Sequence, residues 1–97
     1  MTTPESKIKK DIRDTLRKLG WHYRSIASTQ YTRAGLPDAY AIKKGVVLFL
    51  ELKIETGKQT DAQIKEMLNI QLSSGHYVLV RCFQDIVDYF KKNNLSL

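Results

Sequence analysis

The sequence predicts a single α/β domain in which a mixed β-sheet is flanked by helices. Three observations predict this fold class. Short apolar runs alternate with amphipathic segments along all 97 residues, without a linker or an internal repeat. A two-residue Lys44-Gly45 loop, the commonest tight connection between antiparallel strands, joins two of the apolar runs. The last apolar run follows a long amphipathic segment, so we expect a crossover helix and a final strand in the same sheet.

The expected elements follow the order helix, strand, strand, strand, helix, strand, helix. Their expected bounds are 5–19, 21–26, 37–43, 46–54, 61–72, 76–82 and 84–92, with a polar loop at 27–36. The first helix has a buried stripe formed by Ile8, Ile12, Leu16 and Leu19. The second helix begins with a capping-box pattern, ends before Ser73-Ser74-Gly75, and has an apolar face formed by Ile64, Met67 and Ile70.

The hairpin determines which residues face one another. Its register pairs Lys43 with Val46, Ile42 with Val47, Tyr40 with Phe49 and Asp38 with Glu51. The run from 46 to 50 is apolar at every position, which predicts a central strand buried on both faces. Because side chains alternate along a strand, Glu51 and Lys53 share one face, whereas Leu50 and Leu52 point to the other. Asp38, Glu51 and Lys53 therefore converge on one patch.

Two carboxylates opposed in this way repel each other, because directly paired side chains start only about 4.5–5.5 Å apart. Two arrangements would offset the repulsion between Asp38 and Glu51. One carboxyl keeps its proton because the other raises its pKa, or a divalent cation lies between them. We favour the cation because Glu51 emerges from a core strand. Two carboxylates suit Mg²⁺ or Mn²⁺, which usually bind substrate phosphates as well, so the partner is expected to carry phosphate.

The composition favours a polyanionic partner. The chain has 16 lysine and arginine residues against 10 acidic residues, a formal charge of +6 and a pI near 9.6. The basic residues gather on the first helix and around the hairpin, at Lys7, Lys9, Lys10, Arg13, Arg17, Lys18, Arg24, Arg33, Lys43 and Lys44.

The single cysteine, Cys82, is expected to be a small buried hydrophobe, and it excludes an internal disulfide, which fits a reducing cytosol. No apolar segment reaches the roughly 20 residues of a membrane span, and the first residues lack a signal-peptide core. We therefore expect a soluble cytoplasmic protein that does not bind a membrane.

Two polar residues have both a structural and a functional interpretation. Glu5 falls on the buried stripe of the first helix and would point inward, toward the patch. Thr3-Pro4-Glu5 is also a common helix start, with a cap, a proline and a first-turn acid. Gln63 fits the capping box, in which its side chain returns to the backbone of Thr60. It also lies at the margin of the apolar face of its helix, where it would contact a water or a phosphate.

These residues resemble a known signature. Pro37-Asp38 followed by Glu51-Leu52-Lys53 is similar to the PD-(D/E)XK motif of restriction-endonuclease-like nucleases. The narrower resemblance is to the virus-type replication-repair nuclease group, VRR-NUC, and it covers nearly the whole chain. It rests on Glu5-Ser6, the segment from Arg33 to Asp38, the strand from Phe49 to Lys53, Gly57-Lys58 and Gln63.

The resemblance implies a restriction-endonuclease-like αβββαβ core and metal-dependent hydrolysis of phosphodiester bonds in DNA. Asp38 and Glu51 would hold one or two Mg²⁺ or Mn²⁺ ions, with the Leu52 carbonyl and Glu5 completing the ligands. Lys53 would orient the attacking water or stabilise the developing charge, and Gln63 would assist in positioning. Residues expected to contact DNA are Arg33, Lys43, Lys44 and Lys58.

Stand-alone members of this group resemble Holliday-junction resolvases, which implies a homodimer. The thin core of a 97-residue domain and the need to cut two strands also favour a symmetric dimer. We therefore expect a homodimer acting on branched or flapped DNA in repair or recombination, in the host cytoplasm if the chain is phage-encoded.

Two alternatives to this nuclease remain. One is a non-catalytic DNA-binding module that retains the nuclease fold, and the other is a purely structural ion network of Asp38, Glu51 and Lys53. Two acids placed against DNA phosphates would repel them without serving binding, which favours the enzyme over the binding module. The ion network leaves the basic first helix unexplained.

Overall fold

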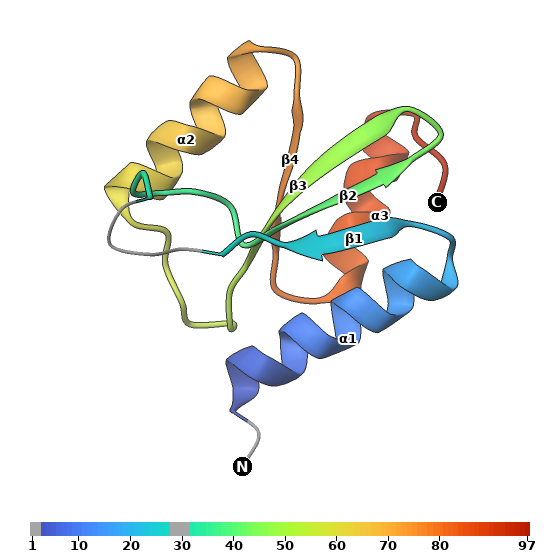
Figure 1. Ribbon diagram of the computed structural model, residues 1–97, viewed down its shortest axis with the longest axis horizontal. Helices are drawn as coiled ribbons and strands as arrows, with labels where there is room; N and C mark the ends of the chain where they lie inside the picture. The colour runs from blue at the N-terminus through green and yellow to red at the C-terminus, as the bar shows by residue number, and fades with distance from the viewer. Residues whose placement is uncertain (1–2, 28–31) are drawn as a thin grey trace.

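The computed structural model describes residues 3–27 and 32–97, which form a four-stranded sheet with three helices (Figure 1). The elements are α1 (Pro4–Lys18), β1 (His22–Ser25), β2 (Ala39–Lys43), β3 (Val46–Leu52), α2 (Asp61–Leu72), β4 (His76–Val80) and α3 (Phe83–Lys92). Their succession confirms the predicted α/β fold. Residues 28–31 of the loop expected at 27–36 lie outside the described residues. None of the helices in the described part is long and apolar enough to cross a membrane.

The sheet is mixed, with the strand order β1-β2-β3-β4. β1 pairs antiparallel with β2 and β2 antiparallel with β3, whereas β4 runs parallel to β3 after the crossover through α2. The hairpin register is the predicted one, with Lys43 opposite Val46, Ile42 opposite Val47 and Tyr40 opposite Phe49. Regular pairing ends at Ala39 and Leu50, so the next opposed residues are Asp38 and Glu51.

The turn between β2 and β3 explains this register. Lys44 has a φ of 49° and Gly45 a φ of 82°, and a type I′ hairpin turn requires positive values at both positions. A glycine adopts such a φ without strain. Because the twist of this turn matches that of the strands, β2 and β3 stay in register to the opposite end of the hairpin, where the two acids lie.

One face of the sheet is covered by α1 and α3. Buried side chains of both helices join those of the strands in one core cluster, which includes Ile12, Leu16, Leu48, Leu50, Ile86 and Phe90. The predicted stripe of the first helix is confirmed at Ile12 and Leu16, and Ile8 packs against the edge of the cluster. Leu19 is exposed instead, because the helix ends at Lys18 and Leu19 caps it.

The opposite face is covered less completely. There α2 packs mainly against β4 and buries none of its own residues, and it stands apart from α1 and α3 (Figure 1). The expectation that the 46–50 run is buried on both faces is wrong, because Val47 is 40% exposed on this side. Ile64 is exposed as well, since α2 turns Met67 and Ile70 toward the sheet, where Ile70 lines a recess together with Phe49.

The chain leaves β4 two residues earlier than expected. The Asp85 carboxylate accepts hydrogen bonds from the backbone NH groups of Arg81 at 2.8 Å and Cys82 at 3.3 Å, so α3 begins at Phe83. Cys82 thus occupies the N-cap position and is exposed. The expectation that Cys82 is a buried hydrophobe is wrong for this reason.

Candidate active site

Asp38 and Glu51 lie together at the end of the hairpin opposite its turn. The backbone NH of Asp38 donates to the Leu50 carbonyl at 3.0 Å, which extends the ladder by one step. The carboxylate of Asp38 accepts a hydrogen bond from the backbone NH of Leu52, with 2.8 Å between Oδ2 and N. These two bonds hold the Asp38 side chain against the end of β3, beside the carboxyl of Glu51.

Glu51 is the one charged residue in the described part of the chain that is buried, with 1% of its surface exposed. Donors from three segments surround its carboxyl. Gln63 Nε2 lies 3.1 Å from Oε1, Tyr77 Oη lies 3.4 Å from Oε2, and Lys53 Nζ lies 3.9 Å from Oε1. The structure therefore brings together Asp38, Glu51, Lys53 and Gln63.

The pKa of Glu51 is raised to about 8. Burial is the largest cause, followed by the hydrogen bond with Asp38 and the negative charge of Asp38, while Lys53 and Tyr77 lower it. At neutral pH and without an added ion, Glu51 keeps its proton, which is the first of the two arrangements that would offset the repulsion. A divalent cation between the carboxylates would displace this proton, so the two arrangements are alternative states of one site.

Tyr77 and Gln59 belong to this site although the sequence analysis did not select them. Tyr77 is buried, its hydroxyl donates to Glu51, and Gln59 Nε2 donates to the same hydroxyl at 3.2 Å. Burial and then the charge of Glu51 raise the pKa of Tyr77 above its ordinary value. Tyr77 lies opposite Phe49 in the parallel register, and Phe49 shares the face of Glu51. The pairing of β4 with β3 could have pointed to Tyr77. The sequence alone does not give this pairing, because it depends on how the crossover places β4.

Gln63 forms the predicted capping box and also contacts the acid pair. Its Oε1 accepts from the Thr60 backbone NH at 2.8 Å, and the Thr60 hydroxyl accepts from the Gln63 NH at 3.1 Å, so the capping box is confirmed. The Nε2 of the same side chain donates to Glu51. The start of α2 is thereby tied directly to the acid pair.

Gly35 brings α2 close enough for this contact. It adopts a φ of 87°, and a Cβ at this position would lie 2.3 Å from the backbone oxygen of Ala62. Real side chains do not tolerate such a distance, so only glycine lets the segment before Asp38 pack against the first turn of α2. This close approach positions Gln63 beside Glu51.

Comparison with solved structures identifies the fold. One structure, described as a VRR_NUC domain, superimposes on this chain with a TM-score of 0.79 and 23% sequence identity, covering 93% of this chain and 97% of that chain. This chain has the fold of a VRR_NUC domain. The predicted resemblance is confirmed at the level of the fold, including its αβββαβ core. No protein-family model and no curated protein match the sequence.

Within this VRR_NUC fold, Glu5 does not join the acid pair. Its side chain is 62% exposed, and its Oε1 lies 3.5 Å from Lys9 Nζ. The helix-start interpretation is confirmed, because the Thr3 side chain caps α1 and Pro4 occupies its first position. Glu5 lies one turn before Ile8, the first α1 residue that packs against the core. The first turn of the helix, which carries Glu5, therefore lies beyond the core. The expectation that Glu5 points inward is therefore wrong.

Without Glu5, the oxygen donors of Asp38 and Glu51 still suit a divalent cation of the magnesium type. In the described residues, no group of three or more His, Cys, Asp or Glu side chains could hold a metal ion. Asp38 and Glu51 nevertheless offer adjacent hard oxygen donors once Glu51 has lost its proton. Mg²⁺ is usually held by one or two carboxylates, with waters and substrate phosphates completing its ligands. A ligand role for the Leu52 carbonyl stays a prediction.

The four expected DNA-contacting residues lie in different places. Lys43 and Lys44 lie at the turn of the hairpin, away from the acids, and Lys43 Nζ is engaged by the Leu19 and Leu97 carbonyl oxygens at 2.5 Å each. Arg33 is exposed, with its Nε 3.7 Å from a Glu66 carboxylate oxygen. Lys58 is exposed in the segment after β3. Arg33 and Lys58 thus belong to segments next to the acid pair, whereas Lys43 and Lys44 do not.

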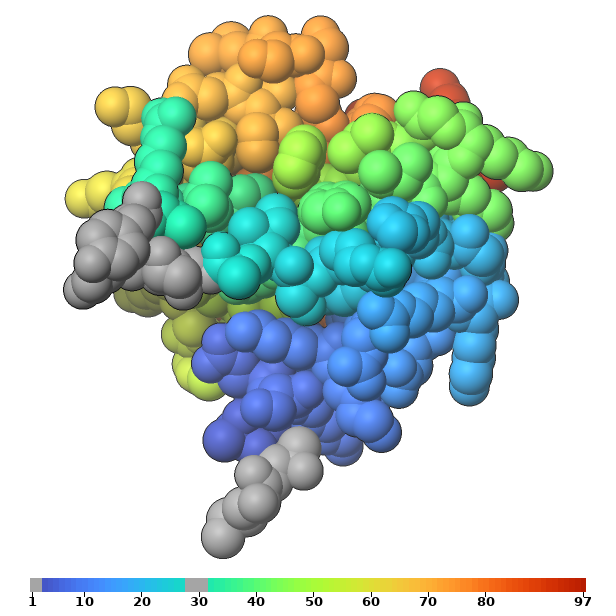
Figure 2. Space-filling view, in the orientation of Figure 1, coloured from blue at the N-terminus to red at the C-terminus, as the bar shows by residue number. Residues whose placement is uncertain are grey.

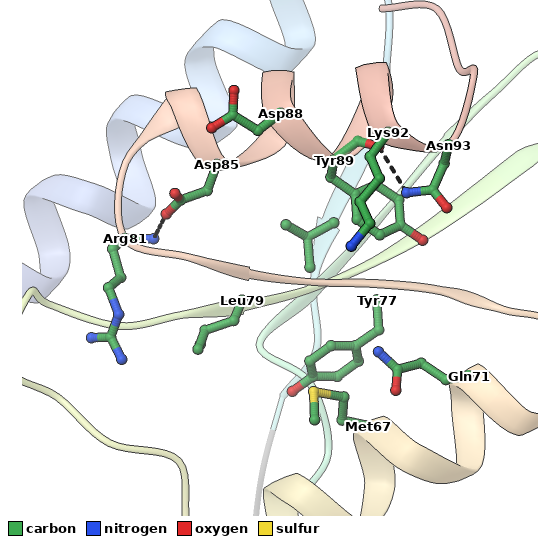
Figure 3. A pocket seen from close by; sticks show the side chains of 11 residues that line it. Met67, Gln71, Tyr77, Leu79, Arg81, Asp85, Asp88, Tyr89, Lys92 and Asn93 are labelled. Carbon is green, nitrogen blue, oxygen red and sulfur yellow. Dashed lines mark hydrogen bonds between the residues drawn. The ribbon is translucent and has the colours of Figure 1, made fainter.

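A cavity of about 660 Å³ lies beside β4 rather than at the acids. Figure 3 shows it between the β4 strand and the helices α2 and α3. Arg81, on its wall, donates to the carbonyl groups of Ile54 at 2.6 Å and Glu55 at 3.0 Å. These bonds hold the segment that follows Lys53, and the sequence analysis did not select Arg81. Tyr77 lines this cavity and contacts Glu51.

Proposed function

We propose that this chain is a divalent-metal-dependent endonuclease that hydrolyses phosphodiester bonds in DNA. The observation that supports it most directly is the contact between two acids, Asp38 and buried Glu51, with Lys53 beside them. The VRR_NUC fold supports the same function, because its name and the resemblance of the motif both indicate a nuclease. A purely structural role explains the contact poorly, since burial of a carboxyl beside another acid destabilises a fold.

The acid pair would hold Mg²⁺ or Mn²⁺. When bound there, such an ion polarises the scissile phosphate and lowers the pKa of a coordinated water. Asp38 supplies an oxygen that is already oriented by the Leu52 NH. Glu51 must lose its proton before it can act as a ligand, so metal binding is expected to release protons below about pH 8.

The surrounding residues act on the acids and on the substrate. Lys53 is 22% exposed and lies within 3.9 Å of Glu51, which lets its ammonium group face both the acid and an approaching phosphate. Preorganised positive charge at that position stabilises the charge that develops on the phosphate. Gln63 and Tyr77 orient Glu51, and the exposed Arg33 and Lys58 would contact the DNA backbone.

A homodimer acting on branched or flapped DNA is the finer part of the proposal. An exposed apolar stripe on α2 supports it, formed at four-residue spacing by Ile64, Leu68 and Leu72. Exposed apolar patches of this kind commonly mark protein interfaces. Sedimentation at micromolar concentration is expected to show a dimer that Leu68→Glu dissociates. A wild-type chain that stays monomeric would remove this part and leave the nuclease proposal intact.

The test of the activity compares supercoiled, linear and four-way-junction DNA, with and without Mg²⁺. Lys53→Ala is expected to lower the cleavage rate by roughly 10²–10³-fold and to spare DNA binding, because its charge acts mainly in the transition state. Asp38→Ala is expected to abolish cleavage and also to weaken Mg²⁺ uptake in calorimetry. Lys91→Ala, on the exposed last turn of α3, is the charge-matched control. Unchanged cleavage by Lys53→Ala would overturn the assignment, and binding without cleavage by the wild type would favour the DNA-binding module.

A further inference from the structure

A second recess lies between the start of α1 and β1. Its volume is about 310 Å³, at the lower end of the range of roughly 300–1,000 Å³ that is usual for ligand sites. Three cations, two serines and a tyrosine line it, and no carboxylate does: Ser6, Lys9, Lys10, Arg13, Tyr23 and Ser25. Figure 2 shows the first turns of α1 directly beside β1 on the same face of the molecule. The recess is therefore a concavity built from two elements, and the charges of its lining favour anions.

Tyr23 adds a hydroxyl to the lining of the recess. Only 2% of Tyr23 is exposed, and its ring belongs to the core cluster, which fixes its position. The same lining carries three cations and two serine hydroxyls. A tyrosine hydroxyl in such a lining can donate a hydrogen bond to an anion with several acceptor oxygens.

The cations of the recess are neutralised only weakly by acidic side chains. Lys9 lies 3.5 Å from Glu5 and Arg13 lies 3.1 Å from Asp14, but the side chains of both pairs are between 38% and 62% exposed. Exposed ion pairs of this kind contribute little and are screened by salt. Lys10 has no ion pair within the described residues. An incoming anion would therefore meet a positive field that the neighbouring acids cancel only in part.

The recess is close to the acid pair. Ser25 lies opposite Ala39 in the sheet, and Ala39 directly follows Asp38. The backbone NH of Ile26 donates to the Asp38 carbonyl at 2.8 Å. The charge of Asp38 also contributes, after burial, to raising the pKa of Tyr23. The two places are thus separated by about one strand of the sheet.

We propose that this recess binds a backbone phosphate of the same nucleic acid strand whose scissile phosphate lies at Asp38 and Glu51. The proposal rests on the proposed nuclease function and names a contact that would determine where the strand is cut. Arginine, lysine, serine and tyrosine side chains are the usual partners of backbone phosphates, and such contacts set the register of a protein on nucleic acid. A phosphate in the recess would fix the distance along the strand to the cleaved bond.

Binding of duplex DNA in EDTA tests the recess independently of cleavage. Tyr23→Phe removes only the hydroxyl and no charge, and it is expected to weaken binding by roughly threefold to tenfold. Lys10→Gln/Arg13→Gln is expected to reduce the slope of log Kd against log salt concentration by about one. The matched control, Lys91→Gln/Lys92→Gln on α3, removes two charges outside the recess and is expected to change the slope less. Thermal unfolding should show that Tyr23→Phe folds as stably as the wild type.

Cleavage of end-labelled DNA in Mg²⁺ then tests the register. Tyr23→Phe is expected to spread the cut over neighbouring positions, whereas the wild type cuts at one. Unchanged DNA binding and an unchanged cut site in Tyr23→Phe would overturn the proposal, as would a double variant that loses no more than its control. If the wild type cuts no DNA at all, the nuclease function fails, and the EDTA binding data still decide whether the recess holds a phosphate.

Discussion

The two faces of the sheet differ in how completely they are covered. On the face that α1 and α3 cover, three core leucines have no exposed surface: Leu16 of α1, and Leu48 and Leu50 of β3. On the face that carries Glu51, Val47 is 40% exposed and no residue of α2 is buried. Hydrophobic stabilisation scales with the apolar area removed from water, so most of it comes from the first face. We call these the closed face and the open face.

The two faces therefore contribute differently to the stability of the fold. Within residues 3–27 and 32–97, only the open face buries a carboxyl, and it holds Glu51 beside Asp38 with the pKa of Glu51 raised. Such an arrangement destabilises the fold unless an ion or a proton relieves it. The closed face supplies the stability that lets the open face keep an unfavourable pair of acids.

The largest effect is expected from truncation in the closed face. Leu50→Ala leaves a cavity under α1 and α3 and is expected to lower the free energy of unfolding by about 2–5 kcal/mol. Leu68→Ala removes the same group from the exposed surface of α2 and is expected to change it by about 0.5 kcal/mol or less. Urea unfolding of both variants at a single low protein concentration measures the difference. Equal losses would show that the two faces contribute alike.

The next effect is a pH dependence that arises in the open face. The pKa of Glu51 in the folded protein, about 8, lies above its ordinary value of 4.5, so the folded state binds the proton more tightly than the unfolded state. Stability is therefore fully present below about pH 4.5 and is lost as the pH rises toward 8. Glu51→Gln abolishes this loss, and at pH 9 in EDTA it is expected to be more stable than the wild type by roughly 2–4 kcal/mol.

The measurement is urea unfolding at pH 5 and pH 9, with the difference between wild type and Glu51→Gln as the quantity of interest. Titrating groups that do not interact with Glu51 are common to both proteins and cancel in this difference. Added Mg²⁺ should raise the unfolding free energy of the wild type at pH 9 and have little effect on the variant, because ligand binding to the folded state stabilises it. A pH-independent difference would contradict the raised pKa.

Local signals in the sequence predicted much of the fold and part of the candidate site, namely Asp38, Glu51, Lys53 and Gln63. The Lys44-Gly45 turn sets the register that opposes Asp38 to Glu51, and the capping box gave the bounds of α2. Both depend on neighbouring residues alone. The incomplete coverage of the open face could not be predicted from the sequence. An apolar run such as that of β3 occurs both in strands covered by a helix and in strands that are partly exposed. Tyr77 was missed because its place beside Glu51 depends on the tertiary position of β4.

Gly35→Ala tests how closely the open face must be assembled. The added methyl group would collide with the Ala62 carbonyl at a positive φ, so α2 must shift and Gln63 must leave Glu51. We expect a loss of about 1–3 kcal/mol in the free energy of unfolding and slower cleavage. Gly45→Ala is the matched control, because Gly45 has a similar φ of 82° and a Cβ added there would meet no atom within 4 Å. Its loss should reflect backbone strain alone and leave cleavage unchanged.

The smallest effect is expected from a single hydroxyl on the open face. Tyr77→Phe removes the donor to Glu51 Oε2, and because this hydrogen bond lowers the pKa of Glu51, its loss raises that pKa further. The pH profile of cleavage should shift to higher pH, with a rate at pH 7 reduced by roughly twofold to tenfold and a smaller reduction at pH 9. Tyr89→Phe is the control, since its hydroxyl contacts His76 Nδ1 at 2.9 Å instead. If both variants moved the profile equally, or neither did, Tyr77 would contribute only packing, and the raised pKa of Glu51 would depend on burial and Asp38 alone.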